Sequence, residues 1–131
     1  MWLLARRRSR VPDIPEVDAL RRALEDGEVL VTTGLVMQEL LQGFNGPKAP
    51  NAIIERFAAL PYLSPDRRDH VDAAALRTRC RRAGVQIGTI DAVLAQLCVR
   101  HDLTMLTTDL DFSRAAKHCA LRIWQSTRLA K

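Results

Sequence analysis

Short apolar or β-branched runs alternate along this chain with longer segments of helical periodicity. In the first clear example, Val17, Leu20 and Leu24 recur at helical spacing, Gly27 ends the segment, and a β-branched run over residues 28–33 follows. Strands that alternate with helices predict an α/β domain built on a parallel sheet. The expected strands cover residues 28–33, 104–107 and 121–124, and the expected helices cover residues 17–27, 35–42, 51–60, 66–83, 90–101 and 112–118.

Length and composition fit one domain over residues 1–131. With 131 residues, 47% of them hydrophobic, the chain can bury a core of its own. No apolar run approaches the roughly 20 residues that a membrane helix needs, and the opening apolar residues precede the first arginines, which reverses the order of a secretory signal. We therefore expect a cytoplasmic protein without a membrane partner. Its cysteines, three in all, are widely spaced, which argues against a disulfide framework.

The chain is basic, and most of its positive charge is arginine. The formal net charge is +5 and the sequence pI is about 9.7. Arginine-rich runs at residues 6–10, 67–68 and 77–82 are most often solvated helix faces. The functional alternative is that they position RNA phosphates, because the planar guanidinium binds phosphate with two parallel hydrogen bonds.

Two carboxylates stand near the starts of expected helices late in the chain. Asp91 follows Thr89-Ile90, and Asp109 follows the expected strand at residues 104–107. Acids at such positions point out of the carboxyl edge of a parallel sheet, where open α/β sheets bind ligands. Each acid also has a purely structural explanation, since an aspartate at the N-cap or in the first turn complements the helix dipole.

A third acid, Glu39, is harder to explain structurally. It lies among Val36, Met37, Leu40 and Leu41, in a helix that otherwise looks core-facing. A charge there is costly unless it is paired or bound to a metal ion. Oxygen ligands of this kind suit Mg²⁺ or Mn²⁺, and no spacing of cysteine and histidine suggests zinc. Three acids on one rim predict a divalent-metal site.

Three stretches of the chain, taken together, resemble the PIN-domain ribonucleases of the VapC toxin type. They are Thr32-Thr-Gly-Leu-Val-Met-Gln-Glu-Leu-Leu-Gln-Gly, Gly88-Thr-Ile-Asp-Ala-Val-Leu-Ala and Leu103-Thr-Met-Leu-Thr-Thr-Asp-Leu-Asp-Phe. Their order and spacing extend the resemblance over nearly the whole chain from about Glu16 onward. The resemblance implies a three-layer sandwich of helices about a central parallel sheet, Mg²⁺- or Mn²⁺-dependent cleavage of RNA, and inhibition by a VapB-type antitoxin.

The resemblance also assigns roles to individual residues. It carries over Glu39, Asp91 and Asp109 as catalytic, metal-binding acids, Asp111 as a further metal ligand, and Thr107 as a polar neighbour. The reaction it implies is metal-assisted hydrolysis of a phosphodiester bond.

The start of the chain departs from this pattern. Such toxins resemble one another in opening with an apolar strand that ends in aspartate, whereas Met1-Trp2-Leu3-Leu4 looks like only the tail of that element. We expect the first strand and the first acid to be missing, which would leave the strands at residues 29–31 and 104–107 with unpaired edges. Either the product is shortened and impaired, or the true start lies upstream of Met1.

Three functions follow as hypotheses. The first is the toxin of a VapBC-type system, an endoribonuclease that acts on RNA such as tRNA or rRNA, forms a homodimer and is inhibited by its antitoxin. The second is a catalytically impaired PIN-fold interaction protein that binds antitoxin or RNA without efficient cleavage. The third is an RNA-binding module that uses the arginines alone. The antitoxin is expected on an apolar surface formed by Met37, Leu41, Phe44, Ile53, Ile54 and Phe57.

Overall fold

A parallel sheet organises the computed structural model, which describes residues 2–4, 19, 22, 25–27, 30–42 and 49–124. Within this described part the sheet has five strands in the order β3-β2-β1-β4-β5, and every neighbouring pair is parallel. The strands are β1 (Trp2–Leu4), β2 (Leu30–Thr33), β3 (Tyr62–Leu63), β4 (Thr104–Leu106) and β5 (Arg122–Ile123). The expected α/β class is confirmed.

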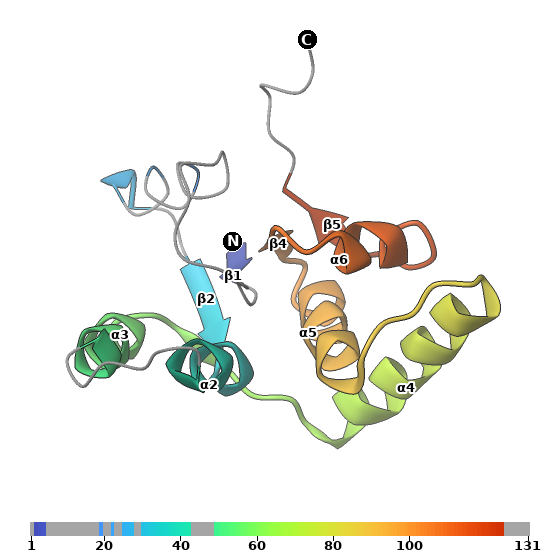
Figure 1. The fold of residues 1–131 in the computed structure, drawn as a ribbon, viewed down its shortest axis with the longest axis horizontal. Coiled ribbons are helices and arrows are strands. Elements are labelled where there is room, and N and C mark those ends of the chain that lie inside the picture. Colours follow the sequence, from blue (N-terminus) through green and yellow to red (C-terminus); the bar gives the residue numbers. More distant parts are fainter. Residues whose placement is uncertain are drawn as a thin grey trace, which may run out of the picture.

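Helices cover both faces of the sheet. They are α2 (Gly34–Gln42), α3 (Ala49–Ala58), α4 (Arg67–Arg82), α5 (Thr89–Arg100) and α6 (Leu110–Ala115). In Figure 1, α2 and α3 lie near β2, and α4, α5 and α6 lie toward β4 and β5. Crossovers between parallel strands are right-handed, so the helices on the path from β1 out to β3 and those on the path back to β5 cover opposite faces of the sheet. This arrangement makes three layers, as the expected sandwich requires. None of the described helices is long and apolar enough to cross a membrane.

The expectation that the central strand is missing is wrong. Trp2–Leu4 forms β1 at the centre of the sheet, where Leu3 is in register with Val31 on one side and with Met105 on the other. Three residues suffice because β2 and β4 are themselves short: β1 pairs with Leu30 and Val31 of β2 and with the whole of β4. The edges of β2 and β4 that were expected to be open are therefore paired.

A second difference concerns residues 61–65, which the sequence suggests are loop. Tyr62–Leu63 forms β3, in register with Thr32 and Thr33 of β2, and the backbone N–H of Thr32 donates to the Pro61 carbonyl at 3.0 Å. A two-residue strand carries no periodic signal of its own. Its identity comes entirely from the neighbouring strand to which it pairs.

The core is centred on α5. Every residue from Asp91 to Cys98 is buried, because α5 is covered by the sheet on one side and by α4 on the other. A helix enclosed in this way has to be apolar nearly all round, which matches its sequence. The first expected helix falls largely outside the described residues, although Ala19, Arg22 and Glu25 are helical and Gly27 has the positive φ of 70° that suits a helix end.

Candidate active site

The order of the strands defines a ligand-binding edge. The chain runs from β1 outward through β2 to β3 and then returns to β4 on the opposite side of β1. The point where the winding direction reverses therefore lies between β1 and β4. In open parallel sheets ligands bind outside the carboxyl ends of the strands at such a point.

Asp91 lies at this edge because α5 runs antiparallel to β4. The helix ends at Arg100, a short turn follows, and β4 starts at Thr104, so the first turn of α5 lies toward the carboxyl end of β4. Gly88 is the N-cap and makes no side-chain capping bond, which places Asp91 in the first turn and not at the cap. The side chain is 9% exposed. Asp91 is therefore not the N-cap, and as an acid in the first turn it complements the helix dipole.

Asp109 reaches the same edge from β4. It is the N-cap of α6, and its Oδ1 accepts a hydrogen bond from the backbone N–H of Asp111 at 2.9 Å. The buried Thr107 fixes the backbone before this cap, because its Oγ1 accepts a hydrogen bond from the backbone N–H of Asp109 at 3.0 Å. The capping explanation thus holds for Asp109, and Thr107 is its polar neighbour.

Asp111 is placed differently. It lies in the first turn of α6, half-buried, and its Oδ1 accepts from Nη1 of Arg114 at 3.3 Å in an ion pair one turn along the helix. An exposed pair of this geometry contributes little to stability. Because Asp111 already pairs with Arg114 on the surface of α6, Asp109 is a stronger candidate for a metal ligand than Asp111.

Glu39 comes to the edge from β2. Thr33, fully buried at the end of β2, accepts a hydrogen bond from the backbone N–H of Val36 at 3.1 Å and so starts α2 directly after the strand. Val36 is in the core, and Glu39 follows it by one turn on the same side of the helix. Glu39 is half-buried and its Oε2 is shielded from solvent.

These three acids have the donor chemistry of a magnesium or manganese site, since carboxylate oxygens are the ligands that such ions prefer. The topology brings their elements to one edge of the sheet from three separate parts of the chain. Among the described residues, no three aspartate, glutamate, histidine or cysteine side chains form a group already close enough to hold a metal ion. The convergence of Glu39, Asp91 and Asp109 within metal-bridging reach stays a prediction.

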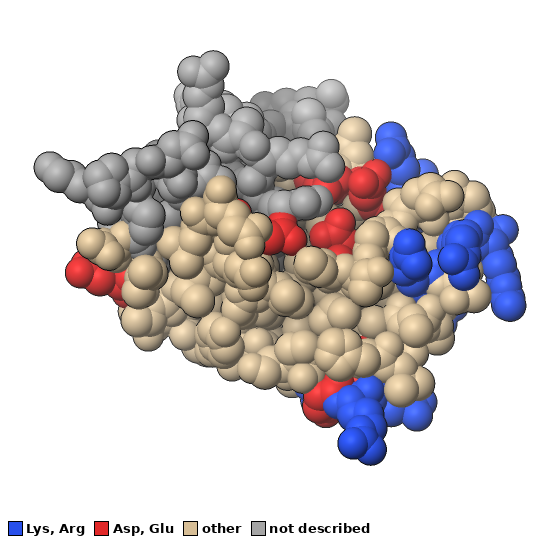
Figure 2. Space-filling view, turned by 60° about the horizontal axis from the view of Figure 1, so that its bottom comes forward, with Lys and Arg blue, Asp and Glu red and all other residues tan. Residues whose placement is uncertain are grey.

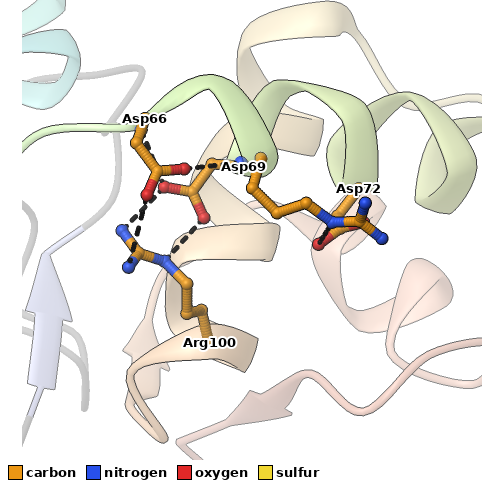
Figure 3. Close-up of polar contacts among 5 residues, drawn as sticks. Asp66, Asp69, Asp72 and Arg100 are labelled. Atoms are coloured by element: carbon orange, nitrogen blue, oxygen red, sulfur yellow. Dashed lines mark hydrogen bonds and ion pairs between the residues drawn. The ribbon is translucent and has the colours of Figure 1, made fainter.

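Sequence reasoning missed a buried ion pair that joins α4 to α5 (Figure 3). The guanidinium of Arg100 contacts both carboxylate oxygens of Asp69, with Nε 2.6 Å from Oδ1 and Nη2 2.7 Å from Oδ2, and Asp69 is fully buried. Asp69 also accepts from the backbone N–H of Asp66, whose carboxylate accepts from the backbone N–H of Asp69 in return. The capping box, an acid three residues after an N-cap aspartate, was a usable signal.

The thiols are not nucleophile candidates. Burial raises the pKa of the Cys98 thiol to about 12, and Cys98 is 1% exposed in the middle of α5. Burial also raises the pKa of Cys80. Since the thiolate is the reactive form, both side chains behave as small apolar core residues.

The structure bears out only part of the apolar surface on which the antitoxin was expected. Phe57 belongs to the core, which corrects its assignment to the surface, while Ile54 is exposed. Met37 and Leu41 line a hollow of about 670 Å³ between α2 and the segment that follows β3, together with Tyr62 and Pro65. Phe44 and the side chain of Ile53 lie outside the described part. A Cβ at Gly34 would overlap the Tyr62 hydroxyl, so a larger residue there would have to displace the exposed Tyr62 side chain.

Comparison with known proteins gives one family match and several similar structures. The family model of the PIN domain matches residues 12–118. The structure of FitAB bound to an IR36 DNA fragment is similar at a TM-score of 0.68 and 20% identity, covering 95% of this chain and 94% of that one. FitAcB from Neisseria gonorrhoeae is similar at a TM-score of 0.64 and 20% identity, covering 96% of this chain and 98% of that one. VapBC2 from Rickettsia felis, bound to a DNA fragment from its promoter, is similar at a TM-score of 0.69 and 17% identity, covering 95% of this chain and 98% of that one.

Proposed function

The chain belongs to the PIN domain family, and from that membership we propose that it is a metal-dependent endoribonuclease of the toxin type. PIN domains are in general nucleases and typically use divalent metal ions. One observation supports the proposal for this chain: the helices that carry Glu39, Asp91 and Asp109, which are α2, α5 and α6, begin at the carboxyl edge of the sheet, where its winding reverses.

In this proposal the three acids would hold Mg²⁺ or Mn²⁺, which supplies an activated water and offsets charge on the reacting phosphate. The protein's own part is to position the carboxylates. Thr107 fixes the backbone of Asp109, and Thr33 fixes the first turn of the helix that carries Glu39. Asp91 is held in the first turn of the most buried helix, so its backbone cannot shift without disturbing the core.

A partner of the VapB antitoxin type belongs to the same proposal. It rests on the resemblance to VapC toxins and on the hollow beside α2, whose lining by Met37, Leu41 and Tyr62 suits the apolar face of a partner helix. The proposal includes a homodimer, with RNA such as tRNA or rRNA as the substrate class.

A second function has an observation of its own in its favour. After β1 the sequence continues with Ala5 and three arginines, so the central strand is followed by no carboxylate comparable to those after β2 and β4. A site with fewer acids would bind metal more weakly and cleave more slowly. The alternative is a PIN-fold protein that binds antitoxin or RNA without efficient cleavage.

Replacing Asp91 by asparagine tests the proposal, because the change keeps the shape of the side chain and removes its charge. We expect Asp91→Asn to lower Mn²⁺-dependent cleavage of RNA by about two orders of magnitude or more, and chelation of the metal to abolish it. Asp102→Asn is the matched control: Asp102 is exposed and has a positive φ of 54° that asparagine tolerates.

Thermal melts of both variants establish that the fold is retained. Equal cleavage by the Asp91→Asn protein and the wild type would contradict the assignment of Asp91. If the wild type binds the antitoxin yet does not cleave RNA with either metal ion, the interaction protein is the correct function.

A further inference from the structure

Two neighbouring hollows lie along α4. The first, about 210 Å³, lies between α4 and α5 and is lined by His70, Ala73, Ala74, Arg77, Thr78, Thr89, Ala92 and Val93. The second, about 470 Å³, continues along α4 and is lined by Ala74, Ala75, Thr78, Arg79 and Arg82. Because Ala74 and Thr78 line both hollows, the two lie next to each other along α4. We call them together the α4 groove.

The α4 groove is suited to an anion. Its lining includes Arg77, Arg79 and Arg82 and the hydroxyls of Thr78 and Thr89, and no aspartate or glutamate is part of it. In the face shown in Figure 2, arginine and lysine side chains gather at the right and, beside an acidic side chain, at the bottom, while other acidic side chains lie nearer the middle.

The arginines are differently held. Nε of Arg77 donates to the carbonyl of Ile87 at 2.7 Å, which fixes its guanidinium beside the turn that leads into α5. Arg79 makes a long contact of 3.4 Å with the carbonyl of His118. Arg82 has no ion pair or hydrogen bond within the described part of the chain. Arginines in the last turn of α4 also complement the helix dipole, but that role does not require a groove.

The groove ends at α5. Thr89, Ala92 and Val93, which line its first hollow, lie on the side of α5 that faces α4, whereas helical spacing places Asp91 on the opposite side. The floor of the groove is made of small side chains, and Val93 is its largest apolar one, so it offers little to anchor an apolar partner helix. A sugar–phosphate backbone needs instead a shallow channel with guanidinium and hydroxyl donors along it.

We propose that the α4 groove binds the phosphate backbone of single-stranded RNA. This inference rests on the proposed endoribonuclease function and names the surface that holds its substrate. Binding of this kind is electrostatic and depends little on base sequence. It therefore predicts a defined dependence of the affinity on salt concentration.

The test uses Arg79→Gln/Arg82→Gln, which removes two charges from the groove, in the full-length protein. The control, Arg67→Gln/Arg68→Gln, removes two charges from exposed positions at the other end of α4. The affinity for a fluorescently labelled single-stranded RNA of mixed sequence is measured in chelator at several salt concentrations, so that cleavage plays no part. Each phosphate contact contributes about 0.7 to the slope of log affinity against log salt.

We expect the groove variant to bind several-fold more weakly and to lose about 1.4 from that slope, while the control keeps the slope of the wild type. Equal losses of RNA affinity in the two variants, or an unchanged salt slope in the groove variant, would overturn the inference. It would also be overturned if the groove variant lost its dimer but kept its affinity for RNA. If the double variant melts early, Arg82→Gln alone replaces it, with an expected loss of about 0.7.

Cleavage by the wild type, measured in parallel with Mn²⁺, separates this inference from the proposed function. If the wild type cleaves RNA and the groove variant keeps the salt slope of the wild type, only the proposal that the groove binds RNA is refuted. If the wild type binds RNA through the groove but does not cleave it, the proposed nuclease activity is refuted and RNA binding by the groove is retained.

Discussion

Single residues at the end of β2 show how one hydroxyl stabilises the site and its neighbour does not. Thr32 and Thr33 are both fully buried. Oγ1 of Thr33 accepts the bond that starts α2, whereas Oγ1 of Thr32 has no hydrogen-bond partner in the described part of the chain. A buried hydroxyl costs free energy unless it is bonded, so identical residues in adjacent positions contribute with opposite sign.

The two threonines therefore predict opposite effects of the same substitution. Thr33→Val should lower the free energy of unfolding by about 1–2 kcal/mol, because α2 loses its first bond while the volume is kept. Thr32→Val should leave that free energy unchanged or raise it by up to about 1 kcal/mol. Urea unfolding of the two variants measures both effects, and equal destabilisation would contradict the different roles.

At the scale of elements, α4 and α5 form an antiparallel pair whose junction is held at one end by an ion pair and has a hollow between the two helices. Asp66 and Asp69 start α4 with reciprocal capping bonds, and Arg100 at the end of α5 closes over both acids (Figure 3). Removing one partner of a buried pair costs far more than the pair contributes, because a charge is left without compensation. The junction thus fixes how α5, with Asp91 at its other end, lies against α4.

Acid should weaken this junction. The hydrogen bond from the backbone N–H of Asp69, helped by the charge of Arg100, holds the pKa of Asp66 below its ordinary value of 3.8. A carboxyl with a lowered pKa in the folded state contributes stability above its unfolded pKa and loses it as the pH falls toward the folded one. We expect the melting temperature to drop below about pH 4 and to drop less in Asp66→Asn. The same acid dependence in both proteins would rule out this source.

At the scale of the whole molecule, β1 joins two halves of the sheet. Strands β3 and β2 lie on one side of it and strands β4 and β5 on the other, and the backbone pairs of Trp2–Leu4 connect them. The candidate acids come from both halves, Glu39 from one and Asp91 and Asp109 from the other. The geometry of the site therefore depends on a strand that contributes no acid.

Proline at the centre of β1 tests this dependence. Leu3→Pro removes the N–H of a residue in register with Val31 and with Met105, and we expect it to cost about 3 kcal/mol or more. Leu3→Val, which keeps the N–H and favours a strand, is the control. Far-ultraviolet circular dichroism during heating measures both variants, and a proline variant that melts with the wild type would show that β1 does not hold the halves together.

The sequence by itself determined the elements with a strong local pattern and the choice of candidate site residues. Local sequence is enough to predict the helix that ends at Arg82, the apolar helix α5, the strand β4 and the acids after it. Helix and strand periods and caps depend on residues only a few positions apart. The PIN resemblance rested on the same stretches. Local patterns also named Glu39, Asp91 and Asp109, since their surroundings are what makes a charge there unusual.

Only the tertiary structure decided what depends on distant partners. Trp2–Leu4 and Tyr62–Leu63 are strands because other strands lie beside them, and Phe57 is core because α3 turns it inward. Arg100 meets Asp69 across 31 positions, and the two hollows of the α4 groove lie next to each other along α4. Contacts between residues far apart in the chain leave no period in the sequence, so packing alone determines them.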